Sequence, residues 1–271
     1  MIELTIFLMT LLAVGVIAGL IAGLFGIGGG IIMVPALFYV LTALGYGETA
    51  MHAAVGTSLT VIVFTSLRSL SEHARHGAVD FETIKTWAPW IVLGALSGSF
   101  VADLIPGQAL TGVFGFVALL LAAQFFFGRP DWKLAEDMPG LPWRALWAGL
   151  IGVLSSFMGI GGGVFGVTLM TLCGRSIHTA VATSAGFGVA IGLPASIGFM
   201  ISGLDEPARA PLSLGYVNLA AFVTLAGAAV LMAPIGARLA HRLDSTRLKR
   251  AFAIGLFIVA LNMVREALFG A

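Results

Sequence analysis

The sequence Gly-Ile-Gly-Gly-Gly occurs twice in this chain, at 26–30 and at 159–163, and each copy lies between apolar runs. A second matching pair follows, His-Ala-Ala-Val-Gly-Thr-Ser at 52–58 and His-Thr-Ala-Val-Ala-Thr-Ser at 178–184. Asp80 and Asn218 form a third pair, and both are candidate N-caps of matching helices. The chain is therefore one unit written twice. Duplication within an apolar chain is typical of membrane transporters, whose binding site forms where the repeats meet.

The composition places this duplicated unit in a lipid bilayer. Hydrophobic residues make up 59% of the 271 positions and charged residues only 10%, whereas a soluble domain carries about 25% charge. Many apolar runs approach the ~20 residues that a spanning helix needs, and the 36 glycines would let such helices pack closely. We predict an all-α polytopic membrane protein. The start of the chain lacks the basic region of a secretory signal, so the first apolar run is expected to remain in the membrane.

The distribution of lysine and arginine predicts how the two units are oriented. We expect two inverted repeats, 1–128 and 144–271, joined by a cytoplasmic linker at 129–143. Each repeat would be a glycine-tipped, broken-helix hairpin followed by three transmembrane helices. All but two of the 14 Lys and Arg residues then fall on one face, the exceptions being Arg209 and Arg265. Cytoplasmic loops are enriched in these residues, so both termini are predicted to lie outside the cytoplasm.

A rival topology replaces each hairpin with a single crossing and makes the repeats parallel. It divides the cationic residues almost evenly between the two faces, so we reject it. The arms of the second hairpin, 144–158 and 164–174, also argue against a crossing. At 1.5 Å per residue they reach roughly 22 and 17 Å, short of a ~30 Å hydrocarbon core. The second glycine tip should therefore stop inside the membrane, and by symmetry the first should approach it from the other side.

The glycine tips are the first part of a predicted substrate site. A run of glycines favours a turn over a helix, so the helix that follows each run begins with unpaired backbone N–H groups. In hydrocarbon each such group costs several kcal/mol, and the helix dipole makes an anion the natural partner. The alternative is that the glycines only permit close helix crossing.

Two Thr-Ser pairs provide the second part, since hydroxyl groups can donate to a dehydrated anion without adding charge. The alternative is that each hydroxyl bonds a carbonyl one turn back in its own helix. The candidate substrate-binding residues are Gly28, Gly29, Gly30, Thr57, Ser58, Gly161, Gly162, Gly163, Thr183 and Ser184.

His52 and His178 are the only duplicated titratable side chains. They are candidates either for helix capping or for coupling and gating, with H⁺ or Na⁺ as the coupling ion. No acidic or basic residue falls in the middle of a span, so a buried carboxylate relay is not evident. A single cysteine excludes an internal disulfide and a cysteine-rich metal site. We expect no metal, no cofactor and no nucleic-acid partner.

An enzyme is disfavoured as well. The segment 182–186 approaches the nucleophile elbow of serine hydrolases. However, Thr60 replaces the second glycine in the first copy, and nothing suggests a strand–turn–helix context.

The order of motifs resembles that of the TauE/SafE sulfite exporter family, also called the 4-toluene sulfonate uptake permease family. The likeness covers nearly the whole chain. It rests on Gly-Ile-Gly-Gly-Gly followed by Pro35, on 54–59 (Ala-Val-Gly-Thr-Ser-Leu), on 77–80 (Gly-Ala-Val-Asp), on 192–195 (Gly-Leu-Pro-Ala) and on 236–240 (Gly-Ala-Arg-Leu-Ala).

This resemblance implies a bacterial inner-membrane protein that moves sulfite or an organosulfonate such as sulfoacetate. We therefore expect a secondary-active anion transporter that works by alternating access, with an anion channel as the alternative. Whether the protein forms a homodimer is left open. The second copy has Ala182 and Ala185 where the first has Gly56 and Leu59. That difference predicts that the two halves hold the substrate unequally.

Overall fold

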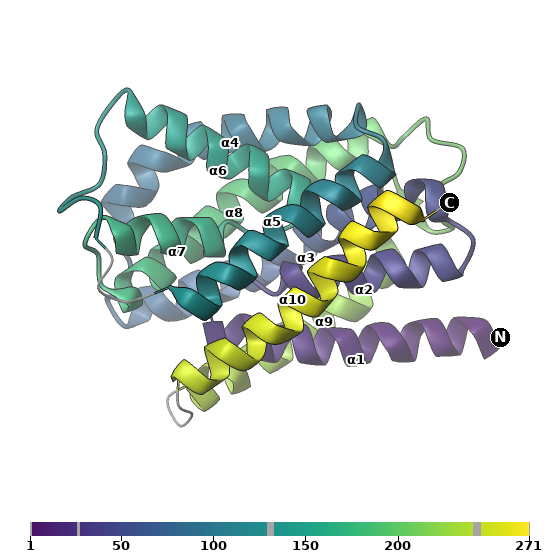
Figure 1. Ribbon diagram of the computed structural model, residues 1–271, viewed down its shortest axis with the longest axis horizontal. Coiled ribbons are helices and arrows are strands. Elements are labelled where there is room, and N and C mark those ends of the chain that lie inside the picture. The colour runs from purple at the N-terminus through teal and green to yellow at the C-terminus, as the bar shows by residue number, and fades with distance from the viewer. Residues whose placement is uncertain (1, 26–27, 129–132, 241–244, 271) are drawn as a thin grey trace.

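The computed structural model describes residues 2–25, 28–128, 133–240 and 245–270. Within these ranges the chain forms ten helices and one two-stranded hairpin (Figure 1). The helices are α1 (Ile2–Phe25), α2 (Gly30–Ala43), α3 (Gly47–Arg75), α4 (Phe81–Asp103), α5 (Gly107–Phe127), α6 (Trp143–Met158), α7 (Gly163–Leu172), α8 (Ile177–Ser202), α9 (Leu219–Ala240) and α10 (Ser245–Phe269). The predicted all-α class is confirmed.

Each half contains five helices in the same order, a pair of hairpin arms followed by three helices of 21 to 29 residues. The first half comprises α1–α5 and the second α6–α10. The strands β1 (Ser213–Leu214) and β2 (Val217–Asn218) pair antiparallel in the segment before α9. This small hairpin was not predicted, because the matching segment of the first half is only a short turn before α4.

Five helical segments in the described chain are long and apolar enough to cross a membrane. They lie in α3, α5, α8, α9 (219–236) and α10 (252–269). The fourth helix was also expected to span, but it is not among them, and it carries Glu82 and Lys85 in its first turns. The arms α2, α6 and α7 are shorter, with 14, 16 and 10 residues. The second hairpin therefore has two arms too short to cross a bilayer, whereas α1, the first arm of the first hairpin, has 24 residues.

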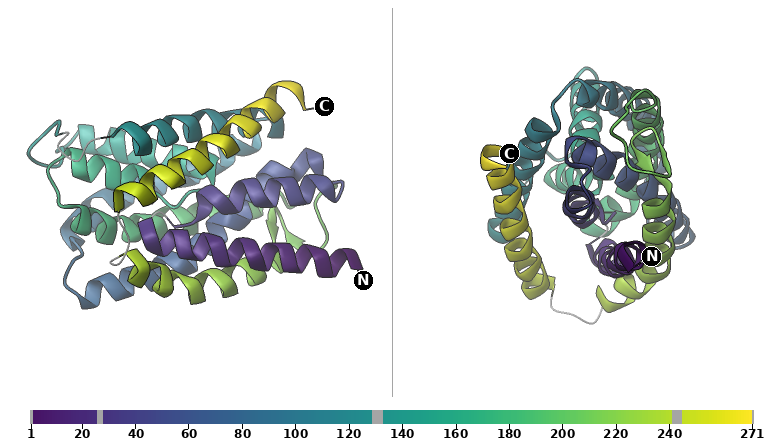
Figure 2. Two further views of the ribbon diagram at one scale, coloured as in Figure 1. Left: turned by 60° about the horizontal axis from the view of Figure 1, so that its bottom comes forward. Right: turned by 90° about the vertical axis from the view of Figure 1, so that its right-hand side faces the viewer.

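Both chain ends lie at the same end of the molecule, and the segment between α5 and α6 lies at the opposite end (Figures 1 and 2). Accordingly α1 extends inward from the end that carries the termini, whereas α6 extends inward from the other end (Figure 1). Arg68, Arg75 and Arg175 are exposed, and Arg175 forms an ion pair with Asp137 of the segment between α5 and α6. Arg129 and Arg242 lie outside the described residues, as do the side chains of Arg238, Arg247 and Lys249.

The two halves exchange the first arm of each hairpin, which packs against a helix of the other half. Helix α1 of the first half packs against α9 of the second, and α6 of the second half packs against α4 of the first (Figure 1). Both contacts depend on glycine. A Cβ atom on Gly19 would lie 2.6 Å from the backbone of Ala229, and one on Gly94 would overlap the carbonyl oxygen of Gly149. Backbones that approach this closely pack well without any hydrophobic driving force between the helices.

Helices α3 and α8 form the centre of the molecule. They pack against each other, and α3 is buried without interruption from Thr49 to Val63. Helices α5 and α10 lie side by side along one flank (Figure 2). The buried centre includes the two Thr-Ser pairs, all four of whose side chains are 0% exposed. These hydroxyl groups are therefore removed from the surface and must find their partners inside the protein.

Candidate functional site

The two glycine tips meet inside the molecule. A Cβ atom on Gly30 would overlap the carbonyl oxygen of Gly159, and one on Gly28 would lie 4.0 Å from the Cα atom of Gly161. Gly29 and Gly162 are the N-caps of α2 and α7, with φ of 77° and 62°. Side chains other than glycine rarely adopt these left-handed conformations. Gly26 and Ile27 of the first motif lie outside the described residues.

The helices that begin at these tips have buried N-termini without side-chain caps. No side chain caps α2 or α7, although Ile31 is 1% exposed and Val164 is 2% exposed. Three other helices of the same core are capped: Asp80 caps α4, Ser176 caps α8, and Asn218 accepts from the amide of Ala221 in α9. Helices α3, α5 and α6 also lack a side-chain cap, but their first residues are exposed or half-buried. Helices α2 and α7 therefore differ from the other uncapped helices in that their N-termini are buried.

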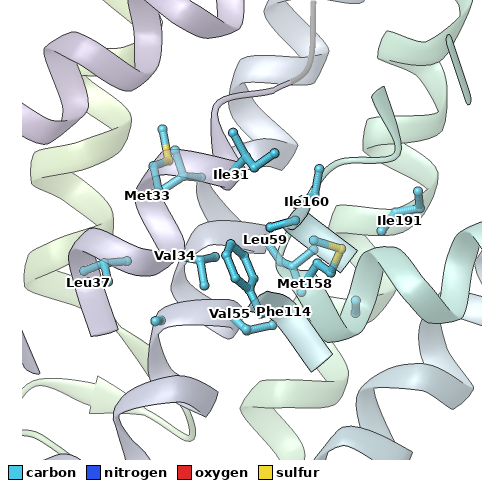
Figure 3. Packing of buried hydrophobic residues seen from close by; sticks show 14 of the residues in the cluster. Ile31, Met33, Val34, Leu37, Val55, Leu59, Phe114, Met158, Ile160 and Ile191 are labelled. Carbon is cyan, nitrogen blue, oxygen red and sulfur yellow. The ribbon is translucent and has the colours of Figure 1, made fainter. Parts of the chain in front are cut away.

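An apolar shell surrounds the meeting point of the tips. Figure 3 shows side chains from α2, α3, α8 and the second hairpin gathered there, including Ile31, Val34, Val55, Leu59, Met158, Ile160 and Ile191. All of these residues are at most 2% exposed. In such a low-dielectric setting, hydrogen bonds to an ion are stronger than in water, and an unpaired polar group is more costly.

The two serines of the duplicated motif have different partners. The Ser58 hydroxyl donates to the carbonyl oxygen of Gly159 at 2.9 Å and so links the first half to the second tip. The Ser184 hydroxyl is buried and has no hydrogen-bond partner among the described residues. A Cβ atom on Gly166, in the first turn of α7, would lie 2.7 Å from Ser184 Oγ. Each serine therefore lies beside a glycine-tipped helix, but only Ser58 is hydrogen-bonded.

The two threonines instead accept hydrogen bonds from the backbone amides of the N-cap residues of α9 and α4. The amide of Asn218 donates to Thr57 Oγ1 at 2.9 Å, and the amide of Asp80 donates to Thr183 Oγ1 at 3.0 Å. Both bonds connect one half to the other, and they are equivalent under exchange of the halves. Asp80 and Asn218 also cap their own helices through the amides of Thr83 and Ala221, as the sequence predicted. The threonines thus join the repeats at the starts of α4 and α9.

The duplicated histidines lie in unlike surroundings. His52 is 5% exposed, and its Nε2 lies 3.1 Å from the carbonyl oxygens of both Ala102 and Ile105. Since carbonyl oxygens only accept, Nε2 carries the hydrogen, and His52 caps the carboxyl end of α4. Its ring stacks on Tyr216 with centroids 4.9 Å apart. His178 is exposed. The structure therefore gives the two copies no common contact.

Tyr216 was not predicted from the sequence. It lies between β1 and β2, beside His52 and the end of α4. Burial raises the pKa of Tyr216, and the negative charge of Asp103, which accepts a hydrogen bond from it, raises that pKa further. The repeat could not indicate this residue, because the first half has no hairpin equivalent to β1–β2.

Charged side chains are absent from the buried interior of the described chain, where the buried polar groups are Ser, Thr, His52 and Asn218. The described residues also contain no cluster of three or more His, Cys, Asp or Glu side chains that could hold a metal. The polar groups around the tips are therefore uncharged donors and carbonyl oxygens.

Comparison with known proteins identifies the fold that carries these features. The sequence profile described as Sulfite exporter TauE/SafE matches residues 11–263. The chain belongs to the TauE/SafE family. A probable membrane transporter protein of Haemophilus influenzae is 33% identical over 260 residues, covering 95% of this chain and 98% of the relative. One from Methanocaldococcus jannaschii is 27% identical, with 97% of both chains covered.

A third TauE/SafE relative, the probable membrane transporter protein YunE of Bacillus subtilis, is 25% identical over 96% of this chain and 98% of its own length. These relatives are named as transporters rather than enzymes, which agrees with the sequence-based expectation. The chain is a multi-pass membrane transporter. The names of these relatives specify no substrate.

Proposed function

We propose that this TauE/SafE protein is a secondary-active transporter that carries a small oxyanion by alternating access. The substrate would lie between the two glycine tips, held by backbone N–H groups at the starts of α2 and α7 and by the hydroxyls of Ser58 and Ser184. The observation that supports this site most strongly is the meeting of two buried, uncapped helix N-termini. Such termini bind anions in soluble proteins and in transporters with broken helices.

The substrate class follows from the donors and from the family. Sulfite, or an organosulfonate such as sulfoacetate, is our first choice because the matching profile is described as a sulfite exporter. A pyramidal XO₃ group presents oxygens on several sides, so it could accept from both helix termini at once. Because the buried polar groups carry no positive charge, binding would depend on neutral donors. We expect modest affinity and ready release, which suit a carrier.

We further propose that residues 1–128 and 144–271 are inverted repeats joined by a cytoplasmic linker at 129–143. The packing of α1 on α9 and of α6 on α4 supports this arrangement, as does the position of the α5–α6 segment at the end opposite to both termini (Figure 1). The exposed Arg175, which pairs with Asp137 of that segment, agrees with the cytoplasmic enrichment of Lys and Arg. In a bacterial inner membrane both termini would then be periplasmic. Coupling to H⁺ or Na⁺ and assembly as a homodimer are further parts of this proposal.

Counterflow in proteoliposomes tests the proposed function. Vesicles loaded with unlabelled sulfite or sulfoacetate should transiently accumulate the labelled anion above its equilibrium level, because a carrier exchanges substrate through one site. An anion channel lacks this exchange and would give no overshoot. A flux that is linear in concentration, without overshoot, would therefore replace the carrier with a channel. Hydrolysis of an ester substrate that is lost in Ser184→Ala but kept in Ser58→Ala would instead indicate an intramembrane hydrolase.

A further inference from the structure

The two halves of the proposed site differ in what occupies them, although the sequence repeats both. On the first-half side, the carbonyl oxygen of Gly159 lies against Gly30, the first residue of α2, and accepts the Ser58 hydroxyl at 2.9 Å. A carbonyl oxygen carries partial negative charge. It therefore stands where an oxygen of a bound anion would meet the same donor.

On the second-half side, the counterpart of Gly159 in the repeat is Gly26, which lies outside the described residues, and none of the described carbonyl oxygens accepts from Ser184. The first three amides of α7, those of Gly163, Val164 and Phe165, have no acceptor within the helix, and the bond from the Gly166 amide to Gly162 O is the first of the helix. The helix lacks a side-chain cap. Ser184 Oγ, 0% exposed and without a partner among the described residues, lies beside this same first turn.

An unpaired hydroxyl in this setting is costly. Removing a polar group from water without a hydrogen bond costs about 1–3 kcal/mol in proteins, and the surrounding shell is apolar. Ser155 Oγ on α6 is likewise buried without a partner among the described residues, but another buried serine of α8 avoids this cost. Ser196, also on α8, donates to the carbonyl oxygen of Leu193 at 3.0 Å. Ser184 has no such bond, and the free amides of α7 lie in the same helical turn as Gly166, the residue beside its hydroxyl. An incoming acceptor could pair with both kinds of donor.

We infer that Ser184 and the amides at the start of α7 form the half-site that first receives the oxyanion, while Gly159 serves as an internal placeholder on Ser58. This inference rests on the proposed function and specifies its order of events. A second oxygen of the substrate takes the Ser58 hydroxyl only after the tip of the second hairpin withdraws Gly159 from α2. The Ser58–Gly159 hydrogen bond is thus broken during transport, and it competes with the substrate.

The test uses the purified protein and measures three properties of three variants: melting temperature, affinity and the rate of exchange in counterflow. Melting temperature is measured without anion, and affinity is measured by calorimetry with sulfite, methanesulfonate and sulfoacetate as probes. Ser184→Ala should melt at or above the wild-type temperature, because it removes an unpaired hydroxyl, yet it should bind the anion at least tenfold more weakly. Ser58→Ala should melt lower, because it loses a hydrogen bond. It should bind as tightly as wild type or up to about tenfold more tightly, but exchange the anion more slowly in counterflow.

Ser196→Ala is the matched control, since it removes a buried hydroxyl of α8 that is already bonded within its own helix. Its affinity should equal that of wild type, and a loss like that of Ser184→Ala would overturn the inference. So would a lower melting temperature of Ser184→Ala without anion, or equal losses of affinity in Ser58→Ala and Ser184→Ala. In the last case a symmetric site, and with it the proposed function, would stand. The proposed function itself fails if wild-type protein shows neither anion binding nor counterflow.

Discussion

Replacing Gly30 with alanine should separate the two glycine tips. The new Cβ atom would overlap the carbonyl oxygen of Gly159 and would lie 2.9 Å from Ile62 Cδ1 and 3.1 Å from Ser58 Oγ. The isoleucine methyl can rotate away, but the backbone oxygen can move only if the whole second tip moves. The overlap would therefore also strain the 2.9 Å hydrogen bond between Ser58 and Gly159.

The magnitude follows from two opposing terms. Overpacking of a filled interior costs about 1–3 kcal/mol, and the rigid neighbour places Gly30→Ala toward the upper limit. The better helix propensity of alanine returns at most about 1 kcal/mol. The net loss of about 2 kcal/mol should lower the apparent melting temperature by roughly 4–8 °C. Counterflow should fall by at least tenfold, because the amide ends of α2 and α7 no longer face each other at the right distance.

Gly149→Ala is the matched control for this experiment. It lies in α6, and a Cβ atom placed on Gly149 would meet nothing within 4 Å. This variant should keep its counterflow activity and melt at the wild-type temperature or slightly above it. The reasoning is refuted if Gly30→Ala transports normally and melts with wild type, or if Gly149→Ala is impaired to the same degree.

Three further predictions concern the tips, the caps and the hairpin before α9. Gly29→Val and Gly162→Val should each abolish transport while the protein still reaches the membrane, because both positions have positive φ; normal uptake by both would contradict the site. The free energy of unfolding of Asp80→Asn should lie within about 0.5 kcal/mol of that of wild type, since an asparagine, Asn218, already fills the matching cap of α9. Asp80→Ala should lower the free energy of unfolding by about 1 kcal/mol. Denaturation of the purified variants measures this difference. The raised pKa of Tyr216 favours the neutral phenol in the folded state. Its contribution is full below its ordinary pKa of 10.0 and is lost as the pH rises toward the folded-state pKa. Above pH 10.0, the melting temperature of Tyr216→Phe should therefore fall less steeply with pH than that of wild type. Identical dependence of melting temperature on pH in the two proteins would refute this account.

The repeat in the sequence predicted the features that depend on local chemistry. Glycine runs imply turns wherever they occur, so the two hairpins and the uncapped starts of α2 and α7 could be expected. Asp80 and Asn218 were recognisable as caps because an N-cap acts within its own first turn. The class and the number of helices in each half followed from the same periodic pattern.

Features set by long-range packing could not be predicted. Ser58 and Ser184 occupy equivalent positions in the repeated motif, but only the folded chain brings the Gly159 carbonyl to Ser58. His52 is buried by the end of α4 and by Tyr216, whereas the copy at His178 is exposed. The threonines were expected near the substrate, yet their partners are amides from the other half. In each case the partner is more than 45 residues away along the chain.

The exchange of hairpin arms has a consequence for synthesis in the cell. The glycine-lined surface of α4 remains open to lipid until α6 has left the ribosome, and the corresponding surface of α1 must wait for α9, almost the whole length of the polypeptide. Helix α1 therefore finds its packing partner only when α9 has been synthesised. Neither half translated by itself could form the α1–α9 and α4–α6 contacts. The two halves should therefore restore a working carrier only when they are produced together in one membrane.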